Sequence, residues 1–320
     1  MNGSLRAAAR ALNVGNGIVV SLVILAVFVA AAALVVPNFF HAQNITNILR
    51  VFAAAGVMAI GLSLVLLIGE IDVSVGSIMS LSVMSSMLFI DQSEYLALAV
   101  LAGVGALCGL VNGLIVAKLK VPSLMVTIGT LSLFGGLASI VVNAQTKFIS
   151  DVYPLFLAIA KGDVMGLPNT FVLCLATAGL AWLLTARTSF GRSMYYVGAN
   201  KRAAYFSGVP VDRVKIVVFV ISGVLAAIAG MLIATQIGRA KSDVGSGYEV
   251  TAIAIAMLGG TSLFGGRGSP LGVLFGMITL GVLTNILALS RMGSHLEIAM
   301  KGVLVIAVVY VYELLRRMAR

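Results

Sequence analysis

Two acidic residues, Glu70 and Asp72, stand between two long apolar stretches with only Ile71 between them. A charged side chain held inside a lipid bilayer costs about 3 kcal/mol or more, so such residues usually line a cavity or a functional pathway. Three interpretations remain open. Asp72 caps the following helix by accepting from its backbone N–H groups, or both acids form an ion or proton site, or both meet water in a short exposed turn.

Polar residues inside other apolar stretches form a second group of candidates. They would either line a hydrophilic route for a polar solute or make hydrogen bonds between helices, worth about 0.6–2 kcal/mol each. Glu249 opens an apolar stretch, where an acidic residue favours the positive end of a helix or takes part in gating. The candidates for a translocation path or a helix cap are Asp72, Ser74, Asn112, Thr127, Glu249 and Asn285.

Motifs for phosphate binding, nucleophilic hydrolysis and zinc-dependent hydrolysis are absent from the sequence. It has no G-x-x-x-x-G-K-[ST], G-x-S-x-G or H-E-x-x-H pattern. The two histidines, His41 and His295, are isolated, and Cys108 and Cys174 each lie inside an apolar stretch. We therefore expect no catalytic site, metal site, disulfide or cofactor, and the chain is not expected to be an enzyme. Without a phosphate-binding loop, the chain is not expected to hydrolyse ATP itself.

The composition indicates that these residues are positioned by helices in a lipid bilayer. Hydrophobic residues make up 60% of the chain and charged residues only 10%, against about 25% charged residues in soluble domains. The apolar stretches are long and continuous rather than alternating, which favours membrane-spanning helices over a barrel. The net charge of +10 comes from basic residues in the loops, which indicates membrane topology rather than nucleic-acid binding.

The hydropathy pattern predicts an all-α polytopic membrane protein with about ten transmembrane helices in a single transmembrane domain over residues 1–320. With both termini in the cytoplasm, 14 of the 21 basic residues lie on the inner side, as the positive-inside rule requires. The spans are expected at about 17–36, 51–69, 72–90, 95–117, 122–142, 169–186, 214–237, 249–264, 270–290 and 296–314.

Two loops are long enough to have roles of their own. The outer loop, roughly 143–168, would cap the external mouth, dock a partner or only connect two spans. The inner loop, roughly 187–213, carries several basic residues and several small ones. It would either fix the topology or dock a cytoplasmic protein.

Glycine patterns add two structural expectations. Gly105, Gly109 and Gly113 recur at every fourth position, so they predict a close helix–helix contact. Two apolar stretches end in glycine- and serine-rich breaks, at 69–77 and 259–269. Both breaks would face the cytoplasm, and they suggest an internal repeat.

Four ordered segments resemble one family. Residues 188–211 resemble the cytoplasmic loop of ABC sugar-import permeases of the ribose, xylose, arabinose and galactose type. Residues 69–77 resemble the family's G-x-I-D-L-S-V-G-S, and residues 122–130 resemble its P-x-F-I-x-T-L-G-T. Gly245–Glu249 with Leu258–Ser269 resemble its glycine-rich segment near the C-terminus. The resemblance runs from about residue 38 to about residue 310.

This resemblance implies a permease subunit of an importer in the bacterial inner membrane, translocating a pentose or hexose. It implies three protein partners: a cytoplasmic ABC ATPase that uses the ATP, a periplasmic sugar-binding protein, and a second permease subunit, identical or paralogous. It also places a short coupling helix for the ATPase near residues 198–208. The residues expected there are Gly198, Asn200, Ala203, Ala204, Ser207 and Gly208.

Other functions fit the same residues. An ion-coupled secondary transporter would use Glu70 and Asp72 as its ion site. A permease of the same class could carry another small polar solute, such as a sugar alcohol, a furanosyl signal molecule or a branched-chain amino acid. A membrane scaffold that transports nothing is a third alternative.

Overall fold

Helices, most of them apolar, form the greater part of the structure. The computed structural model describes residues 17–37, 39–141, 143, 145–149 and 153–290, with the isolated positions 299, 300, 302, 303, 306 and 310. Within this part, six helices are long and apolar enough to cross a membrane. They are α3 (Ala42–Leu67), α5 (Glu94–Lys118), α6 (Ser123–Val141), α8 (Asn169–Arg187), α11 (Val211–Gln236) and α13 (Pro270–Leu289). The chain is therefore an all-α, multi-pass membrane protein.

Shorter elements complete the described part of the chain. Apolar α2 (Gly17–Val35) packs on α13, whereas α4 (Val75–Ser86) and α12 (Tyr248–Leu258) lie inside the bundle. The remaining helices lie in the connections: α7 (Pro154–Lys161), α9 (Ser189–Ala199) and α10 (Lys201–Phe206). Four two-residue strands form two antiparallel pairs, β1 (Lys147–Phe148) with β4 (Arg239–Ala240) and β2 (Asp163–Val164) with β3 (Leu167–Pro168).

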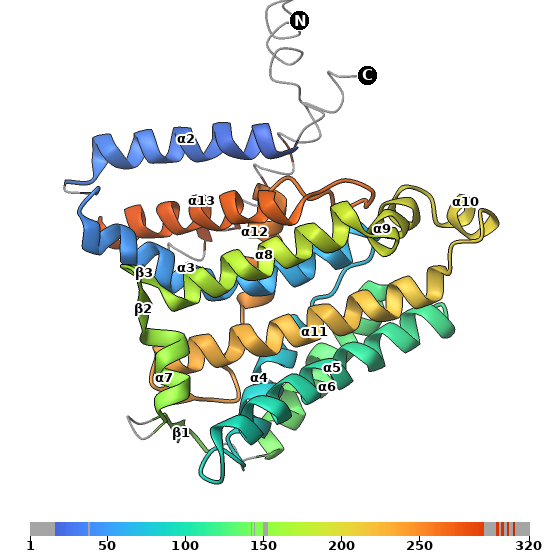
Figure 1. Cartoon of the computed structure of the whole chain (residues 1–320), viewed down its shortest axis with the longest axis horizontal. Helices are drawn as coiled ribbons and strands as arrows, with labels where there is room; N and C mark the ends of the chain where they lie inside the picture. Colours follow the sequence, from blue (N-terminus) through green and yellow to red (C-terminus); the bar gives the residue numbers. More distant parts are fainter. Residues whose placement is uncertain are drawn as a thin grey trace, which may run out of the picture.

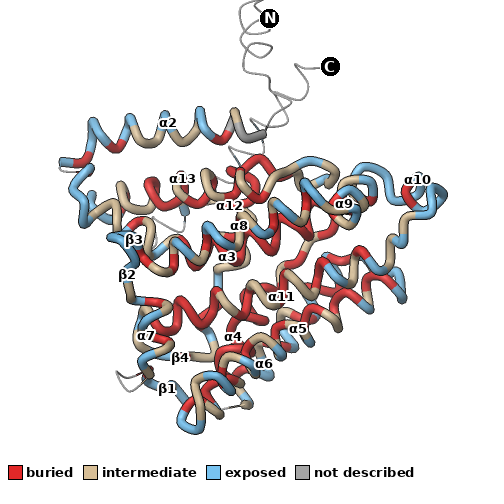
Figure 2. Tube along the Cα trace, viewed as in Figure 1, coloured by how far each residue is buried: buried red, intermediate tan, exposed pale blue. Residues whose placement is uncertain are grey.

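The long helices lie side by side in layers (Figure 1). In this view α2 and α13 lie along the upper edge, α3 and α8 below them, α11 across the middle, and α5 and α6 along the lower edge. The buried residues concentrate on α3, α4 and α11, which form the centre of the bundle (Figure 2). The outer helices keep apolar side chains on their surfaces, as lipid contact requires.

The glycine repeat on α5 makes the close contact that its spacing predicts. A methyl group added at Gly105 would lie 2.7 Å from Cβ of Ala227, and one added at Gly113 would lie 2.9 Å from Cα of Ile216. Both neighbours belong to α11, so the two helices approach almost backbone to backbone. Small residues permit this approach in lipid, where packing replaces the hydrophobic effect.

Nine of the ten predicted spans coincide with helices in the described residues, and two of them are shorter than predicted. The spans at 72–90 and 249–264 are the 12-residue α4 and the 11-residue α12. Glycines with positive φ, among them Gly69 before α4 and Gly260 after α12, end the helical path. The span at 296–314 falls mostly outside the described residues, as do both chain ends, so ten crossings and cytoplasmic termini stay predictions.

The connections between the long helices lie at two opposite ends of the bundle (Figure 1). At one end the guanidinium of Arg50 donates to Asp163 at 2.7 Å, which ties α3 to the β2–β3 hairpin. At the other end, where α9 and α10 lie (Figure 1), Lys118 at the end of α5 pairs with Asp212 at the start of α11 at 3.2 Å. The predicted outer loop contains α7 and the hairpin, and its role as a cap, a docking site or a connection stays a prediction.

Candidate functional site

The two acids lie in a buried break between α3 and α4. After α3 ends, Gly69 adopts φ +71° and the chain continues as a non-helical segment, residues 68–74. Glu70 is 5% exposed and Asp72 is completely buried. The interpretation as a water-exposed turn is therefore wrong, because the neighbouring helices cover the segment.

Two lysines, one from the inner loop and one from the start of α11, form ion pairs with Glu70. The Nζ atoms of Lys201 and Lys215 each lie 2.8 Å from the same carboxylate oxygen, Oε1. Lys201 Nζ also donates to the carbonyl of Gly69 at 3.2 Å. Burial raises the pKa of Glu70, but the hydrogen bonds from the two ammonium groups outweigh it and bring the pKa below its ordinary value. The carboxylate, which lies outside the long helices, is therefore ionised.

Asp72 orders the approach to α4. Its Oδ1 accepts from the backbone N–H of Ser74 at 2.9 Å and from the Ser74 hydroxyl at 2.6 Å. The Ser74 oxygen in turn accepts from Nδ2 of Asn112 on α5, at 2.8 Å. Both bonds reach Ser74, the N-cap residue of α4, rather than the N–H groups of its first turn, so the capping interpretation stays a prediction.

Helix α6 holds the same segment from another side. The N–H of Ile71 donates to Oγ of Ser123 at 3.1 Å, and the Thr127 hydroxyl lies 3.3 Å from the carbonyl of Ile71. Asp72, Ser74, Asn112 and Thr127 are all buried. Four of the six predicted path or cap residues therefore meet at one break in the bundle.

The other two predicted residues occupy separate places. Oε1 of Glu249 accepts from the N–H of Gly247 at 3.2 Å, in the first turn of α12 as predicted. Its Oε2 lies at the start of α4, 2.5 Å from where a Cβ on Gly76 would stand. Asn285 exchanges side-chain hydrogen bonds with Asn44 at 2.8 and 3.1 Å, which links α13 to α3. Asn285 thus fits the interpretation as an interhelical contact.

The predicted short helix in the inner loop is α10. Asn200 separates it from α9, and its Oδ1 accepts from the N–H of Ala203 at 3.0 Å as an N-cap. Ala204 is buried, whereas Tyr205 and Phe206 are 69% and 81% exposed. Gly208 ends the helix with φ +80°. Helix α10 projects from the end of the bundle, and its surface is mostly exposed (Figures 1 and 2).

Both glycine-rich breaks meet beneath this loop. The N–H of Gly266 donates to the carbonyl of Leu67 at 2.9 Å, which joins the second break to the end of α3. Gly198 packs onto both backbones, so a methyl group there would overlap them. The Tyr195 hydroxyl donates to the carbonyl of Gly268 at 2.9 Å. The inner loop is therefore bonded directly to the two breaks.

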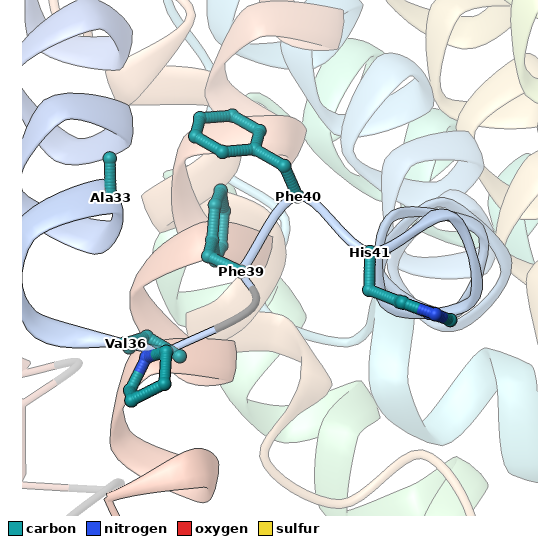
Figure 3. A pocket seen from close by; sticks show the side chains of 6 residues that line it. Ala33, Val36, Phe39, Phe40 and His41 are labelled. Carbon is teal, nitrogen blue, oxygen red and sulfur yellow. The ribbon is translucent and has the colours of Figure 1, made fainter.

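Cavities lie at two separate places in the described residues. One of about 530 Å³ opens beside Glu70 and is also lined by Lys120, Lys201, Tyr205 and Lys215. Another of about 360 Å³ lies between α2 and α3 (Figure 3). There the rings of Phe39 and Phe40 meet edge to face, 5.1 Å apart. This second cavity contains none of the predicted site residues.

Sequence reasoning missed Lys215, Ser123 and Tyr195. Lys215 is the most informative omission, because an acid predicted to be buried requires a basic partner. The basic residues that flank the inner loop supply both partners of Glu70, which is the signal that could have found them.

Comparison with known proteins places these features in a family. Residues 44–311 match the family described as the permease component of branched-chain amino acid transport systems. The ribose import permease of Haemophilus influenzae is 34% identical over 293 residues, covering 90% of this chain and 91% of the relative. The L-arabinose transport permease of Escherichia coli is 34% identical over 290 residues, with 90% and 88% covered. The D-allose transport permease of the same species is 33% identical over 303 residues, with 92% and 91% covered.

No solved structure matches the chain. The match to the family covers α3 through α13, including the break at Glu70 and Asp72 and the inner loop with α10. The four ordered segments that resembled ABC sugar-import permeases fall inside it. This chain therefore belongs to the transport-permease family that includes the ribose, arabinose and allose import permeases.

Proposed function

We propose that this chain is the membrane-spanning subunit of an ABC importer and that it translocates a monosaccharide of the pentose or hexose class. Three relatives are named for ribose, L-arabinose and D-allose, each similar over about nine-tenths of this chain. The protein lies in the bacterial inner membrane as a single permease domain. It pairs with a second permease subunit, and a periplasmic binding protein delivers the sugar at the end of the bundle that carries α7.

The ATPase acts on α10 in this proposal. The observation that carries it is the exposure of Tyr205 and Phe206 on a short, capped helix at one end of the bundle. Large apolar side chains that project from a loop into water are suited to a groove on a partner. Six predicted residues shape the element, namely Gly198, Asn200, Ala203, Ala204, Ser207 and Gly208.

Transport follows by alternating access. ATP binding closes the ATPase dimer, and α10 transmits that movement to the breaks beneath it. The sugar released by the binding protein enters a route between the two permease subunits. In the described conformation Asp72, Ser74, Asn112 and Thr127 are covered by neighbouring helices, so any polar route through them is closed until helices move. The binding protein supplies affinity, so the membrane route need not hold the sugar tightly.

A crosslinking experiment tests the partner assignment. Phe206→Cys, expressed with the ATPase and binding protein of its own transport system, should crosslink to the ATPase. A cysteine at the opposite end, Met165→Cys, is the matched control, because Met165 is 99% exposed in the β2–β3 hairpin. Crosslinking of the ATPase to position 165 and not to position 206 would refute the proposal.

The description of the matched family names another solute class, branched-chain amino acids. The solute is decided by the ligand that copurifies with the partner binding protein. A monosaccharide supports the proposal, whereas an amino acid would transfer this permease to the other solute class and leave the role of α10 unchanged.

A further inference from the structure

We propose that Glu70 is a positioning residue that connects α10 to the buried segment 68–74, and that its two lysines form one fixed and one releasable arm. This inference rests on the proposed function, because it assigns how movement of α10 reaches the membrane helices. It concerns how the fold transmits that movement and leaves open which solute is carried.

The two arms differ in how firmly the fold holds them. Lys215 lies in the second turn of the 26-residue α11, and its side chain is 14% exposed. Lys201 is the first residue of the six-residue α10, and its side chain is 44% exposed. Both Nζ atoms lie 2.8 Å from Oε1 of Glu70, whose side chain is 6% exposed. Lys215 is therefore the fixed arm and Lys201 the arm that can exchange with water.

Because both lysines contact the same oxygen of Glu70, releasing Lys201 costs little free energy. A buried carboxylate that loses its only basic partner is strongly destabilised. If Lys201 were the only basic partner of Glu70, this ion pair would hold α10 in place. Because Lys215 stays, Lys201 can leave without abandoning a buried charge, and the loss of repulsion between the two ammonium groups offsets part of the lost attraction.

The structure also provides space for the released arm. The cavity of about 530 Å³ lies beside this ion-pair cluster and is lined by Lys201 and Tyr205 of α10. On its far side are Val116 and Ala117 of α5 and Val121 and Pro122, which precede α6. The cavity therefore gives the Lys201 side chain room to move away from Glu70.

Beyond Glu70 the connection continues through hydrogen bonds. Ile71, the next residue, is bonded to Ser123 and Thr127 of α6. Asp72 is bonded through Ser74 to Asn112 of α5. A shift of Glu70 thus moves the anchors of α4, α5 and α6 together. An ion-pair cluster that only stabilised the fold would leave transport per ATP unchanged in any variant that still folds.

The test uses the complete importer in proteoliposomes, with this chain, its ATPase subunit and its binding protein. Five variants are compared: Lys201→Met, Lys201→Arg, Lys215→Met, the pair Glu70→Gln with Lys215→Met, and Lys118→Met. The last is the matched control, because Lys118 makes an exposed ion pair with Asp212 at the same end and does not touch Glu70. Thermal unfolding, ATP hydrolysis and sugar uptake are measured for each.

Lys201→Met should unfold at the wild-type temperature and hydrolyse ATP, with sugar transported per ATP lowered by about 5- to 150-fold, the range usual for coupling between two sites. Lys201→Arg should recover much of the loss. Lys215→Met should lower the unfolding temperature. The double variant with Glu70→Gln should unfold at the wild-type temperature, but its sugar transported per ATP should stay low. Lys118→Met should behave as wild type.

Wild-type transport per ATP in Lys201→Met would overturn this inference alone, provided that the wild-type importer is active. An equal loss in Lys118→Met would also overturn it, because the effect would then follow from surface charge. Absence of ATP-driven uptake by the wild-type assembly would instead overturn the proposed function, and this inference with it.

Discussion

Replacing Gly198 with alanine should separate the inner loop from the two breaks it rests on. Gly198 lies near the end of α9, where it packs against the backbone of Leu67 and Gly266. The N–H of Gly266 and the carbonyl of Leu67 are already bonded at 2.9 Å. A methyl group would overlap both atoms, and the next contact, Gly266 Cα, would lie at 3.1 Å. Both neighbours are backbone, so α9 must move away rather than a side chain rotate.

The magnitude follows from three contributions. Forcing a methyl group into a packed contact costs about 1–3 kcal/mol. Loss of the Gly266–Leu67 hydrogen bond costs about 1 kcal/mol. Alanine in place of glycine in a helix returns about 0.8–1.0 kcal/mol. The net expectation is a destabilisation of about 1–3 kcal/mol, which lowers the unfolding temperature.

The matched control is Gly179→Ala on α8, because an added methyl group there meets nothing within 4 Å. Only the helix-propensity gain applies, so this variant should be unchanged or slightly more stable. Both variants are measured by thermal unfolding in detergent and by ATP-driven uptake. If Gly198→Ala is as stable and as active as Gly179→Ala, the assigned contact between the inner loop and the breaks is incorrect.

Three further predictions concern single residues. Asp72→Ala removes the acceptor for Ser74 and should destabilise the chain by about 1–3 kcal/mol in thermal unfolding; unchanged stability with transport alone lost would favour an ion pathway instead. The pKa of Glu70 is lowered in the fold, so its contribution is complete above the ordinary pKa and disappears as the pH falls through the lowered value; stability measured from neutral to acidic pH should therefore fall more steeply for wild type than for Glu70→Gln. Gly208→Trp places a bulky side chain at φ +80° beside α10 in open space, so expression should persist while uptake per ATP falls, and normal uptake would count against the role of α10.

Local signals in the sequence predicted the long helices, whereas the family resemblance placed the inner-loop element, whose ends also have local signals. Asn200 lies three residues before Ala203, whose N–H it caps, and Gly208 supplies the positive φ that ends α10. Such features depend only on neighbouring residues, so they can be read from the sequence. The glycine repeat on α5 was equally informative, because its spacing specifies one face of a helix.

Features that depend on distant residues were not predictable in the same way. Hydropathy could not separate α4 and α12 from full crossings, because a helix buried among other helices is as apolar as one in lipid. The burial of Glu70 depends on Lys201, which is 131 residues away in the sequence. Asn285 was grouped with the path residues, yet its partner is Asn44 on α3. Polarity identified these residues as unusual, and only the fold assigns their partners.

Uptake by reconstituted proteoliposomes tests the central claim most directly. The labelled solute is the monosaccharide that copurifies with the partner binding protein, and the ATPase subunit is either present or omitted. The proposal predicts uptake only when the ATPase, ATP and the loaded binding protein are all present, with no effect of an ionophore. Vigorous uptake by this chain alone, driven by an ion gradient and abolished by an ionophore, would contradict it.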